Sequence, residues 1–326
     1  MALAPAAERP TLLVLRALGL GDLLAAVPAL RALAAAFGEY RRLLAVPPAL
    51  APLAALIREA GGRPCFAPVP AAPLGPLPPA ALRSDVAVNL HGSGPQSHAV
   101  LRAVRPQRLI AFAHPAIDAH RGPAWREDEH EARRWCRLLQ ESGISADPRR
   151  LEISRPPRAR PAPPQAAGAT LLHPGAASAA RRWPAPGWVA VARAERARGR
   201  TVLLTGGPQE RGLALGIARA AGIPPSAVLA GRTDVLDLAA VVAAAGRLVC
   251  NDTGVAHLAT ALGTPSVILF GPTSPAQWGP PPVARHRVLW AGRTGDPHGD
   301  HCDPGLRAIT PEQVVVELRA LETMSA

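Results

Sequence analysis

Short apolar runs alternate along the chain with longer segments whose apolar residues recur at helical spacing. In the first half, strand-like runs cover 11–17 (TLLVLRA), 41–46 (RRLLAV), 84–90 (SDVAVNL) and 108–113 (RLIAFA). Segments with helical spacing cover 23–37, 48–62 and 127–143. This alternation predicts βαβ units and a parallel sheet.

The second half of the chain repeats the alternation. Predicted strands cover 170–173, 200–207, 226–231, 247–251 and 265–271, and predicted helices cover 188–199, 208–222, 234–246, 252–263 and 310–322. Thr310 is the expected N-cap of the last helix, with Pro311 as its first residue. Between the halves, 146–169 is rich in Pro and Arg and lacks periodicity, as is typical of an extended linker.

These elements predict the α/β fold class, with two doubly wound parallel-sheet domains that face each other across a central cleft. A length of 326 residues suits two domains of ordinary size. The predicted organisation is an N-terminal domain over 1–150, a linker over 151–168, a C-terminal domain over 169–309 and a closing helix over 310–326.

The composition narrows the classes of partner. The net charge is +12, and Arg supplies all of the permanent cations because Lys does not occur. A basic surplus of this size favours anionic partners such as nucleotides or an anionic membrane surface. Aromatic residues make up only 3% of the chain, and no Arg-rich block is interleaved with them, which argues against nucleic-acid binding.

The apolar runs and the cysteines indicate the compartment. Pro, Gly or Arg interrupts every apolar run before the ~18 residues that a spanning helix needs, and the N-terminus has no pattern of a secretory signal. The cysteines are far apart and match no metal-binding spacing; they are Cys65, Cys136, Cys250 and Cys302. We therefore expect a reduced, cytoplasmic location, with which peripheral contact at the inner membrane face is compatible.

Three strand–helix junctions in the second half carry candidate chemistry, because open α/β sheets bind ligands where a strand's carboxyl end leads into a helix. In HPGAASAARRWP, Gly175 permits close backbone approach, and Ser178 and Arg181 suit phosphate oxygens. The same residues would also fit a surface loop with solvated arginines. In LLTGGPQERG, Glu210 stands in a first helical turn, either to bind ribose hydroxyls or only to complement the helix dipole.

The third junction is NDTGVAHLATALG. Asp252 is either a helix N-cap or a ligand-binding carboxylate, Thr253 and Gly254 present N–H groups, and His257 follows within about one helical turn. The triplet Asp-Thr-Gly also occurs in aspartic proteases. That class needs two such loops in a largely β protein, so we reject it.

The first half contains one comparable junction, RALGLGDLLAAVP. Gly19 and Gly21 begin a dinucleotide-type fingerprint, but Leu24 occupies the place of its third Gly, which disfavours a nicotinamide enzyme. Asp22 follows at the predicted helix start. It is either a helix cap or a carboxylate that is available as a base.

Taken together, these loops resemble glycosyltransferase family 9, the heptosyltransferases and their relatives. The resemblance rests on RALGLGDLLAAVPAL, HPGAASAARRWP, LLTGGPQE, NDTGVAHLATALGTPSVILFGPTSPAQWGP and ITPEQVV, which together span nearly the whole chain. It implies the GT-B fold, two Rossmann-like domains facing a cleft. It also implies inverting, metal-independent transfer of a sugar from a nucleotide-diphosphate donor, best known as ADP-heptose, to an acceptor hydroxyl of a glycan or glycosylated metabolite.

The resemblance also implies roles for individual residues. Asp22 matches the family's general base. Arg181 stands where heptosyltransferases usually have Lys, and its charge would offset that of the departing diphosphate, although its shape differs. The implied donor and nucleotide ligands are Gly175, Ser178, Glu210, Asp252, Thr253, Gly254 and His257. No cofactor and no metal are expected, and the partners are a nucleotide sugar and a glycan or small-molecule acceptor.

Two further segments have candidate roles. NLHGSGPQSH is the expected acceptor-facing loop, with contacts at His91, Ser93 and Ser97. The loop 298–303, which contains His298, His301, Cys302 and Asp303, reads either as a metal cluster or as a surface or acceptor-side loop. We expect no metal there, because the polar side chains are crowded and no second group pairs with them.

Two other functions fit the same loops. A sugar-nucleotide epimerase or hydrolase would share the donor site but would need further carboxylates deep in the cleft. A non-catalytic nucleotide-sugar binder would keep the donor loops but would have no use for Asp22. The acceptor, the donor's base and sugar, and the oligomeric state stay open at the level of the sequence.

Overall fold

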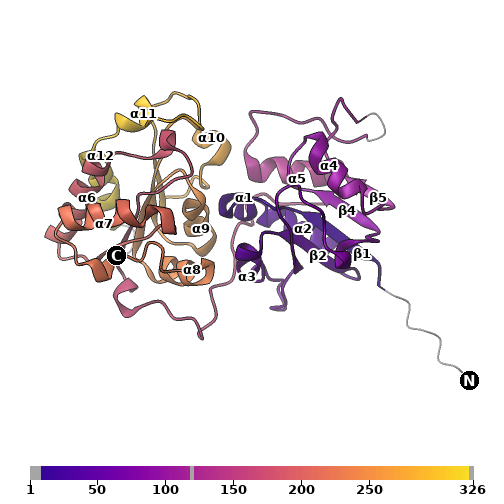
Figure 1. Cartoon of the computed structure of the whole chain (residues 1–326), viewed down its shortest axis with the longest axis horizontal. Coiled ribbons are helices and arrows are strands. Elements are labelled where there is room, and N and C mark those ends of the chain that lie inside the picture. Colours follow the sequence, from indigo (N-terminus) through magenta and orange to yellow (C-terminus); the bar gives the residue numbers. More distant parts are fainter. Residues whose placement is uncertain (1–8, 118–120, 323–326) are drawn as a thin grey trace, which may run out of the picture. The chain divides into compact units, whose positions relative to one another are not determined.

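The computed structural model describes residues 9–117 and 121–322 (Figure 1). The chain divides into two compact units, an N-terminal unit over Met1–Arg150 and a C-terminal unit over Leu151–Ala326. Each unit contains one five-stranded sheet whose strands all pair in parallel. The predicted α/β class with two parallel sheets is therefore confirmed.

The sheet of the N-terminal unit has the order β3-β2-β1-β4-β5. Its strands are β1 (Thr11–Leu15), β2 (Arg41–Val46), β3 (Ala67–Pro70), β4 (Val86–Asn89) and β5 (Arg108–Ile110). The strand order reverses between β1 and β4, which pair with each other. Open α/β sheets bind ligands at the carboxyl ends of strands beside such a switch point.

The sheet of the C-terminal unit has the order β10-β9-β8-β6-β7. Its strands are β6 (Thr170–His173), β7 (Val202–Leu204), β8 (Arg247–Asn251), β9 (Ser266–Leu269) and β10 (His286–Leu289). Here the order reverses between β6 and β8, so the ligand-binding edge is expected where these two strands end.

The helices lie in the connections between strands and after the last strand. In the N-terminal unit they are α1 (Leu20–Ala25), α2 (Val27–Ala36), α3 (Ala51–Ala54), α4 (Pro95–Arg102) and α5 (Glu131–Glu141). In the C-terminal unit they are α6 (Ala185–Ala197), α7 (Arg211–Ala220), α8 (Val235–Ala244), α9 (Gly254–Leu262), α10 (Pro275–Trp278), α11 (Pro304–Arg307) and α12 (Pro311–Glu322). Short 3-10 turns cover 48–50, 79–81, 164–166, 179–181, 208–210 and 225–227.

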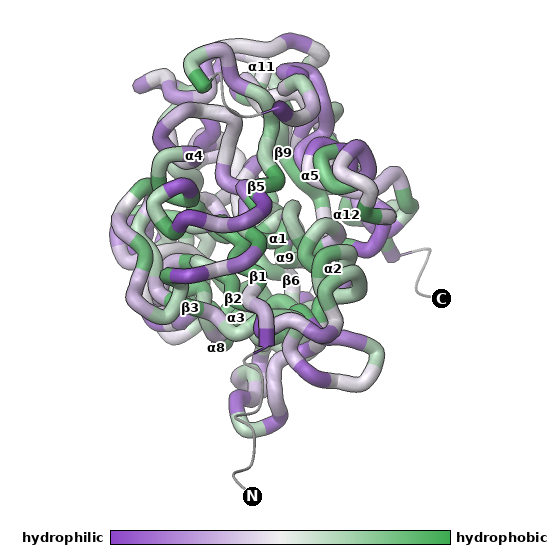
Figure 2. The backbone as a smooth tube through the Cα atoms, turned by 90° about the vertical axis from the view of Figure 1, so that its right-hand side faces the viewer, coloured by the Kyte–Doolittle hydropathy of each residue, from purple (hydrophilic) through white to green (hydrophobic). Residues whose placement is uncertain are grey.

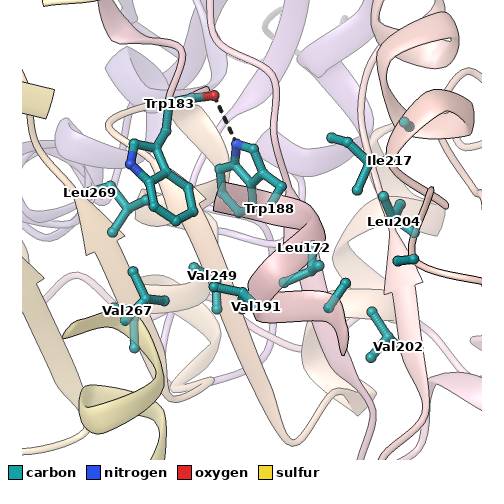
Figure 3. Close-up of a cluster of buried hydrophobic side chains, with 14 of the residues drawn as sticks. Leu172, Trp183, Trp188, Val191, Val202, Leu204, Ile217, Val249, Val267 and Leu269 are labelled. Carbon is teal, nitrogen blue, oxygen red and sulfur yellow. Dashed lines mark hydrogen bonds between the residues drawn. The ribbon is translucent and has the colours of Figure 1, made fainter. Parts of the chain in front are cut away.

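Apolar side chains of the strands form the cores. The tube in Figure 2 is green, that is hydrophobic, along most of β1, and Leu12, Leu13 and Val14 are fully buried. In the C-terminal unit, Trp183 and Trp188 pack edge to face with ring centroids 5.4 Å apart, above aliphatic side chains of the sheet (Figure 3). Burial of this much apolar surface is the main favourable term in folding.

Two predicted helices differ from the structure, and proline explains the difference in one of them. The segment 23–37 lies in two helices, α1 and α2, because Pro28 lacks the N–H that would donate to the Leu24 carbonyl in one continuous helix. The segment 48–62 is mostly irregular, with only a 3-10 turn and the four-residue α3. Pro48 and Pro52 occupy first-turn positions there, where proline is tolerated.

Two of the four edge strands, β3 and β10, are missed by the apolar pattern. β3 contains Pro68 and Pro70, which only an edge strand accommodates, and β10 (HRVL) is half polar. The strand predicted over 226–231 is instead a 3-10 turn with one bridge, between Val228 and Leu204.

An ionic network fastens the amino-terminal end of the C-terminal sheet. Arg247, the first residue of β8, is buried, and its Nη2 lies 2.6 Å from Oε2 of the buried Glu195. Thr170 Oγ1 donates to the same Glu195 oxygen at 2.5 Å. Arg247 Nη1 donates to Leu318 O at 3.0 Å and to Glu322 Oε1 at 2.8 Å. The network joins α6 and α12 to the sheet at the end opposite to the loops that carry the candidate chemistry.

The last helix begins as predicted. Thr310 Oγ1 accepts from Gln313 N at 3.3 Å, and Pro311 is the first helical residue. Residues 323–326 of the predicted closing helix lie outside the described residues. In 9–117 and 121–322, no helix has the length and apolar character needed to cross a membrane.

Candidate active site

Asn251 organises the carboxyl edge of the C-terminal sheet at its switch point. It ends β8 and is fully buried. Its Nδ2 donates to the carbonyls of Pro174 (2.9 Å) and Gly175 (3.2 Å), and its Oδ1 accepts from Trp183 N (3.1 Å). One side chain therefore holds both ends of the loop 174–183. The sequence analysis did not single out Asn251; an amide that closes an apolar strand is the available signal, because a buried amide needs partners.

The loop 174–183 is also anchored by its tryptophan. Trp183 Nε1 donates to Ile309 O at 3.0 Å, and Trp188 Nε1 donates to Trp183 O at 3.1 Å (Figure 3). A methyl group at Gly187 would overlap the Trp183 ring, so the glycine allows this close packing. Arg181 thus lies two residues from a fixed point of the core.

The segment 297–303 braces the middle of the same loop. Ser178 Oγ donates to Pro297 O at 2.6 Å, and Ala180 N donates to Gly299 O at 3.0 Å. Asp303 N donates to Ala180 O at 3.1 Å. The predicted donor residue Ser178 is therefore already engaged in shaping the loop.

Arg181 and Asp252 interact electrostatically at this edge of the sheet. Asp252 is 5% exposed. Burial raises the pKa of its carboxyl to about 6, against the opposing effects of the Arg181 charge and a hydrogen bond with Thr273. Arg181 is partly exposed, with its Nε 3.4 Å from Ser178 Oγ. The edge therefore combines a permanent cation with a carboxyl of increased proton affinity.

The helix α9 starts directly after Asp252 and gives this edge a positive end. Its first residue is Gly254, and Thr253, not Asp252, occupies the N-cap position. The Thr253 side chain makes no capping hydrogen bond, so the first N–H groups of the helix are suited to an anion. His257, in the next turn, packs against the ring of Trp278 with centroids 5.8 Å apart.

Glu210, in the junction after β7, lies against Gly175, in the junction after β6. Glu210 Oε2 accepts from Gly207 N at 2.7 Å, and a methyl group at Gly175 would overlap the Glu210 carboxylate. His173, which ends β6, lies 3.9 Å from the same carboxylate, and its Nδ1 is 2.9 Å from Thr205 Oγ1. Burial lowers the pKa of His173, although Glu210 opposes this. All three predicted junctions thus converge on one sheet edge.

In the N-terminal unit, Asp22 lies in an ionic cluster at the switch point. It is the third residue of α1, its Oδ2 accepts from Gly19 N at 3.2 Å, and its side chain is 32% exposed. Arg16 Nη2 lies 3.4 Å from Asp22 Oδ1 and 2.9 Å from Glu131 Oε1. Burial raises the pKa of Asp22; Arg16 opposes the increase and Glu131 adds to it. Sequence reasoning missed Arg16 and Glu131.

The loop after β4 contains the predicted acceptor contacts. His91 N donates to Asn89 Oδ1 at 3.0 Å, and burial together with the Arg16 charge lowers the pKa of His91 to about 4. Ser97 is 3% exposed, and its Oγ is hydrogen-bonded to Asn89 Nδ2 (2.9 Å) and to Gly94 O (3.0 Å). Ser97 therefore shapes the loop, which leaves His91 and Ser93 as the candidates for acceptor contact.

Comparison with known proteins identifies the family. Glycosyltransferase family 9 (heptosyltransferase) matches residues 116–299, more than half of the chain. The chain belongs to glycosyltransferase family 9. This confirms the membership that its motifs predicted.

Curated relatives of this family 9 chain match it in part. It is 35% identical to lipopolysaccharide heptosyltransferase 2 of Escherichia coli over 152 residues, 44% of this chain and 43% of the relative. It is also 35% identical to lipopolysaccharide heptosyltransferase 3 of Escherichia coli over 112 residues, 34% of this chain and 33% of the relative. The chain spans less than half the length of these curated relatives.

Solved structures resemble the family 9 chain over almost its whole length. A family 9 glycosyltransferase from Veillonella parvula covers 97% of this chain and 98% of its own, with a TM-score of 0.77 at 19% identity. ADP-heptose LPS heptosyltransferase II of Escherichia coli covers 97% of this chain and 100% of its own, with a TM-score of 0.74 at 20% identity. These likenesses confirm the GT-B fold.

A more distant structure of this fold is described as iron-containing. It is the dodecameric glycosyltransferase TibC of enterotoxigenic Escherichia coli, with a TM-score of 0.63 at 15% identity, covering 98% of this chain and 77% of its own. In the described part of the family 9 chain, no group of three or more His, Cys, Asp or Glu is placed to hold a metal ion. Within the loop 298–303, Asp303 Oδ1 caps α11 through Gly305 N (2.8 Å) and Leu306 N (3.1 Å).

Proposed function

We propose that this family 9 chain is an inverting glycosyltransferase that moves heptose from ADP-heptose to an acceptor hydroxyl of a glycan or glycosylated metabolite. The observation that carries the proposal is the convergence of Arg181, Glu210 and the uncapped start of α9 on one sheet edge. A cation and free N–H groups suit a diphosphate, and a carboxylate suits ribose hydroxyls. The relative named an ADP-heptose heptosyltransferase supports the choice of donor.

The proposed reaction is a single displacement. Asp22 takes the proton of the acceptor hydroxyl while that oxygen forms a bond to the anomeric carbon of the sugar. The bond from the anomeric carbon to the diphosphate oxygen breaks, and its electron pair leaves with the diphosphate. Attack from the face opposite to the leaving group inverts the anomeric centre. The raised pKa of Asp22 brings its proton affinity closer to neutral pH, which suits a general base.

Metal independence is part of the proposal. The charge that grows on the departing diphosphate is offset by the Arg181 guanidinium and by the N–H groups at the start of α9. His257, held against Trp278, is a further donor on the same helix. These groups would take the place that a divalent ion has at the leaving group in a metal-dependent enzyme.

The proposal is tested by binding and by transfer. Thermal shift with ADP-, GDP-, UDP- and dTDP-linked sugars should give the largest increase in melting temperature for ADP-heptose, because ligand binding to the native state stabilises it. Labelled ADP-heptose and heptose-free lipopolysaccharide should yield a heptosylated product with inverted anomeric configuration by NMR. A stronger response to another nucleotide sugar would refute the donor assignment. An altered sugar nucleotide formed without acceptor would favour an epimerase.

Removal of divalent ions should leave transfer unchanged. After dialysis against EDTA, the rate of heptose transfer should stay within about twofold of the untreated enzyme, because side chains and N–H groups offset the leaving-group charge. The control is the same enzyme with Mg²⁺ restored. A loss of rate in EDTA that Mg²⁺ reverses would contradict metal independence.

A further inference from the structure

We propose that Arg16 is a positioning residue for transfer: it holds the base Asp22, the acceptor-facing loop and Glu131 in one cluster at the switch point of the N-terminal sheet. The inference rests on the proposed function, in which Asp22 is the base. Arg16 follows β1 directly and is 1% exposed, so it acts through its neighbours and not by contact with substrate.

All three nitrogens of the Arg16 guanidinium have hydrogen-bond partners. Nε donates to the carbonyl of Asp22 at 2.9 Å, and Nη1 donates to the carbonyl of Leu90. Nη2 donates to Glu131 Oε1 at 2.9 Å and lies 3.4 Å from Asp22 Oδ1. The guanidinium is planar, so the directions of its N–H groups are fixed relative to one another. Arg16 therefore sets the distance between α1 and Leu90, the residue before His91.

Glu131 forms the far wall of the cluster. It is the first residue of α5 and 5% exposed. Its Oε1 also accepts from Trp135 Nε1 at 2.8 Å, and its Oε2 accepts from Arg134 Nη1. The Trp135 ring lies beside the guanidinium, with Arg16 Cζ 4.9 Å from the ring centroid. The orientation of Arg16 is therefore determined on the side away from Asp22, independently of any ligand.

The two partners have opposite electrostatic effects on the base. Besides burial, the charged groups that face Asp22 are Arg16, which lowers its pKa, and Glu131, which raises it. Arg134 pairs with Glu131, and Arg16 helps to keep His91 neutral. Substitutions of Arg16 and Glu131 should thus shift the pKa of Asp22 in opposite directions.

The test is a titration of Asp22 in the full chain. Carboxyl ¹³C NMR on isotopically labelled protein, with the Asp22 signal identified by its loss in Asp22→Asn, should show a pKa increase in Arg16→Gln and a decrease in Glu131→Gln, each of about half a unit or more. Glu129→Gln is the matched control, because Glu129 pairs with Arg137 and not with Arg16. Glu129→Gln should leave the pKa of Asp22 unchanged.

Transfer kinetics should distinguish the effect of the Arg16 geometry on catalysis from the effect of its charge. With ADP-heptose and heptose-free lipopolysaccharide, Arg16→Lys keeps the charge but loses the fork, so kcat should fall about 10- to 100-fold with little change in KM. The acidic limb of the kcat/KM profile should follow the shifts of the Asp22 pKa in Arg16→Gln and Glu131→Gln. ADP binding should be unchanged throughout, because the proposed nucleotide edge lies in the C-terminal unit, and an unchanged circular dichroism spectrum verifies that each variant is folded.

The two proposals fail in different ways. If Asp22→Asn abolishes transfer but the Asp22 pKa does not move in Arg16→Gln and Glu131→Gln, the positioning role is wrong and the proposed function stands. If Asp22→Asn transfers heptose at the normal rate, Asp22 is not the base, and both proposals about it are wrong. A wild-type kcat in Arg16→Lys would also refute the positioning role.

Discussion

At the scale of single residues, burial at the strand ends decides which protonation state the fold favours. It raises the pKa of Asp252 to about 6 and lowers the pKa of His91 to about 4. The Asp252 carboxyl and the His91 imidazole therefore each carry a cost of ionisation in the native state. Perturbed groups of this kind cluster at functional sites, and both residues lie beside a switch point.

The ionisation of Asp252 should appear in the pH dependence of stability. Its folded pKa lies above the ordinary 3.8, so the stability it contributes is present below pH 3.8 and is lost as the pH rises to about 6. The loss amounts to about 3 kcal/mol. In Asp252→Asn, which cannot ionise, the unfolding free energy relative to wild type should rise by about that amount between pH 4 and pH 8.

Urea unfolding at the two pH values measures this difference. Asp300→Asn, at an exposed carboxyl of the same unit, is the matched control and should show no such rise. A flat difference for Asp252→Asn would mean that the carboxyl is solvated in the native protein.

Arg181 is the second residue whose charge matters. Arg181→Ala should weaken ADP binding about tenfold and lower kcat about 100-fold, because one charge-assisted contact to the diphosphate is lost. Arg181→Lys should keep most of the ADP affinity and most of kcat, because lysine also carries a positive charge. Arg219→Ala, at an exposed arginine of α7, should change neither quantity. Calorimetry with ADP and initial-rate kinetics measure them; unchanged kinetics in Arg181→Ala would exclude the leaving-group role.

At the scale of elements, the donor edge depends on loops that fasten one another. Asn251 holds both ends of 174–183, and Glu210 closes over Gly175. A glycine is needed at 175 because a carboxylate occupies the space where a side chain would start. The position of Glu210 is thus set by a residue on a different strand–helix junction.

Gly175→Ala tests this dependence. The new methyl group should displace the Glu210 side chain and weaken ADP binding about tenfold, with a stability loss of about 1 kcal/mol or less because the flexible Glu210 side chain is partly exposed and can move. Gly212→Ala, in α7 with open space at its Cβ, is the control and should bind ADP normally. Normal ADP affinity in Gly175→Ala would show that Glu210 does not bind the nucleotide. Calorimetry and urea unfolding supply both values.

At the scale of the whole molecule, the C-terminal sheet has its candidate chemistry at one end of its strands and a stabilising ionic network at the other. In the C-terminal unit the carboxyl edge carries the candidate donor loops, whereas the amino edge carries the network of Arg247, Glu195 and Glu322. The Arg247 network lowers the pKa of Glu322 to about 2, chiefly through the Arg247 hydrogen bond. A defect at the amino edge should therefore change folding without changing binding.

Arg247→Met tests this separation. It leaves the 1% exposed Glu195 without its cationic partner, which should lower the unfolding free energy by about 3 to 5 kcal/mol. The affinity of the remaining folded protein for ADP should equal that of the wild type. Arg198→Met, which removes only a partly exposed ion pair to Glu322, is the control and should cost about 1 kcal/mol or less. Weaker ADP binding in folded Arg247→Met would contradict the separation.

The predictable parts of the fold were those with strong local signals. The central strands β1, β4, β6 and β8 are continuous apolar runs, and each appears close to its predicted range. The edge strands β3 and β10 were missed, because a strand that pairs on one side only can contain Pro or charged residues. The ends of the helices near Pro28 and Pro52 were not predicted, because they depend on which backbone N–H and C=O groups are hydrogen-bonded in the folded protein.

The sequence by itself determined the central strands, most of the longer helices, the family, and which loops follow the strand ends. These properties depend on residues within a few positions of one another, and the loops with Asp22, Arg181, Glu210 and Asp252 follow from them. Only the tertiary structure decided which side chains pair. Arg16 meets Glu131 across 115 positions, and Asn251 meets Pro174 across 77. Burial and partner set the proton affinity of each group, and both arise only when distant segments pack together.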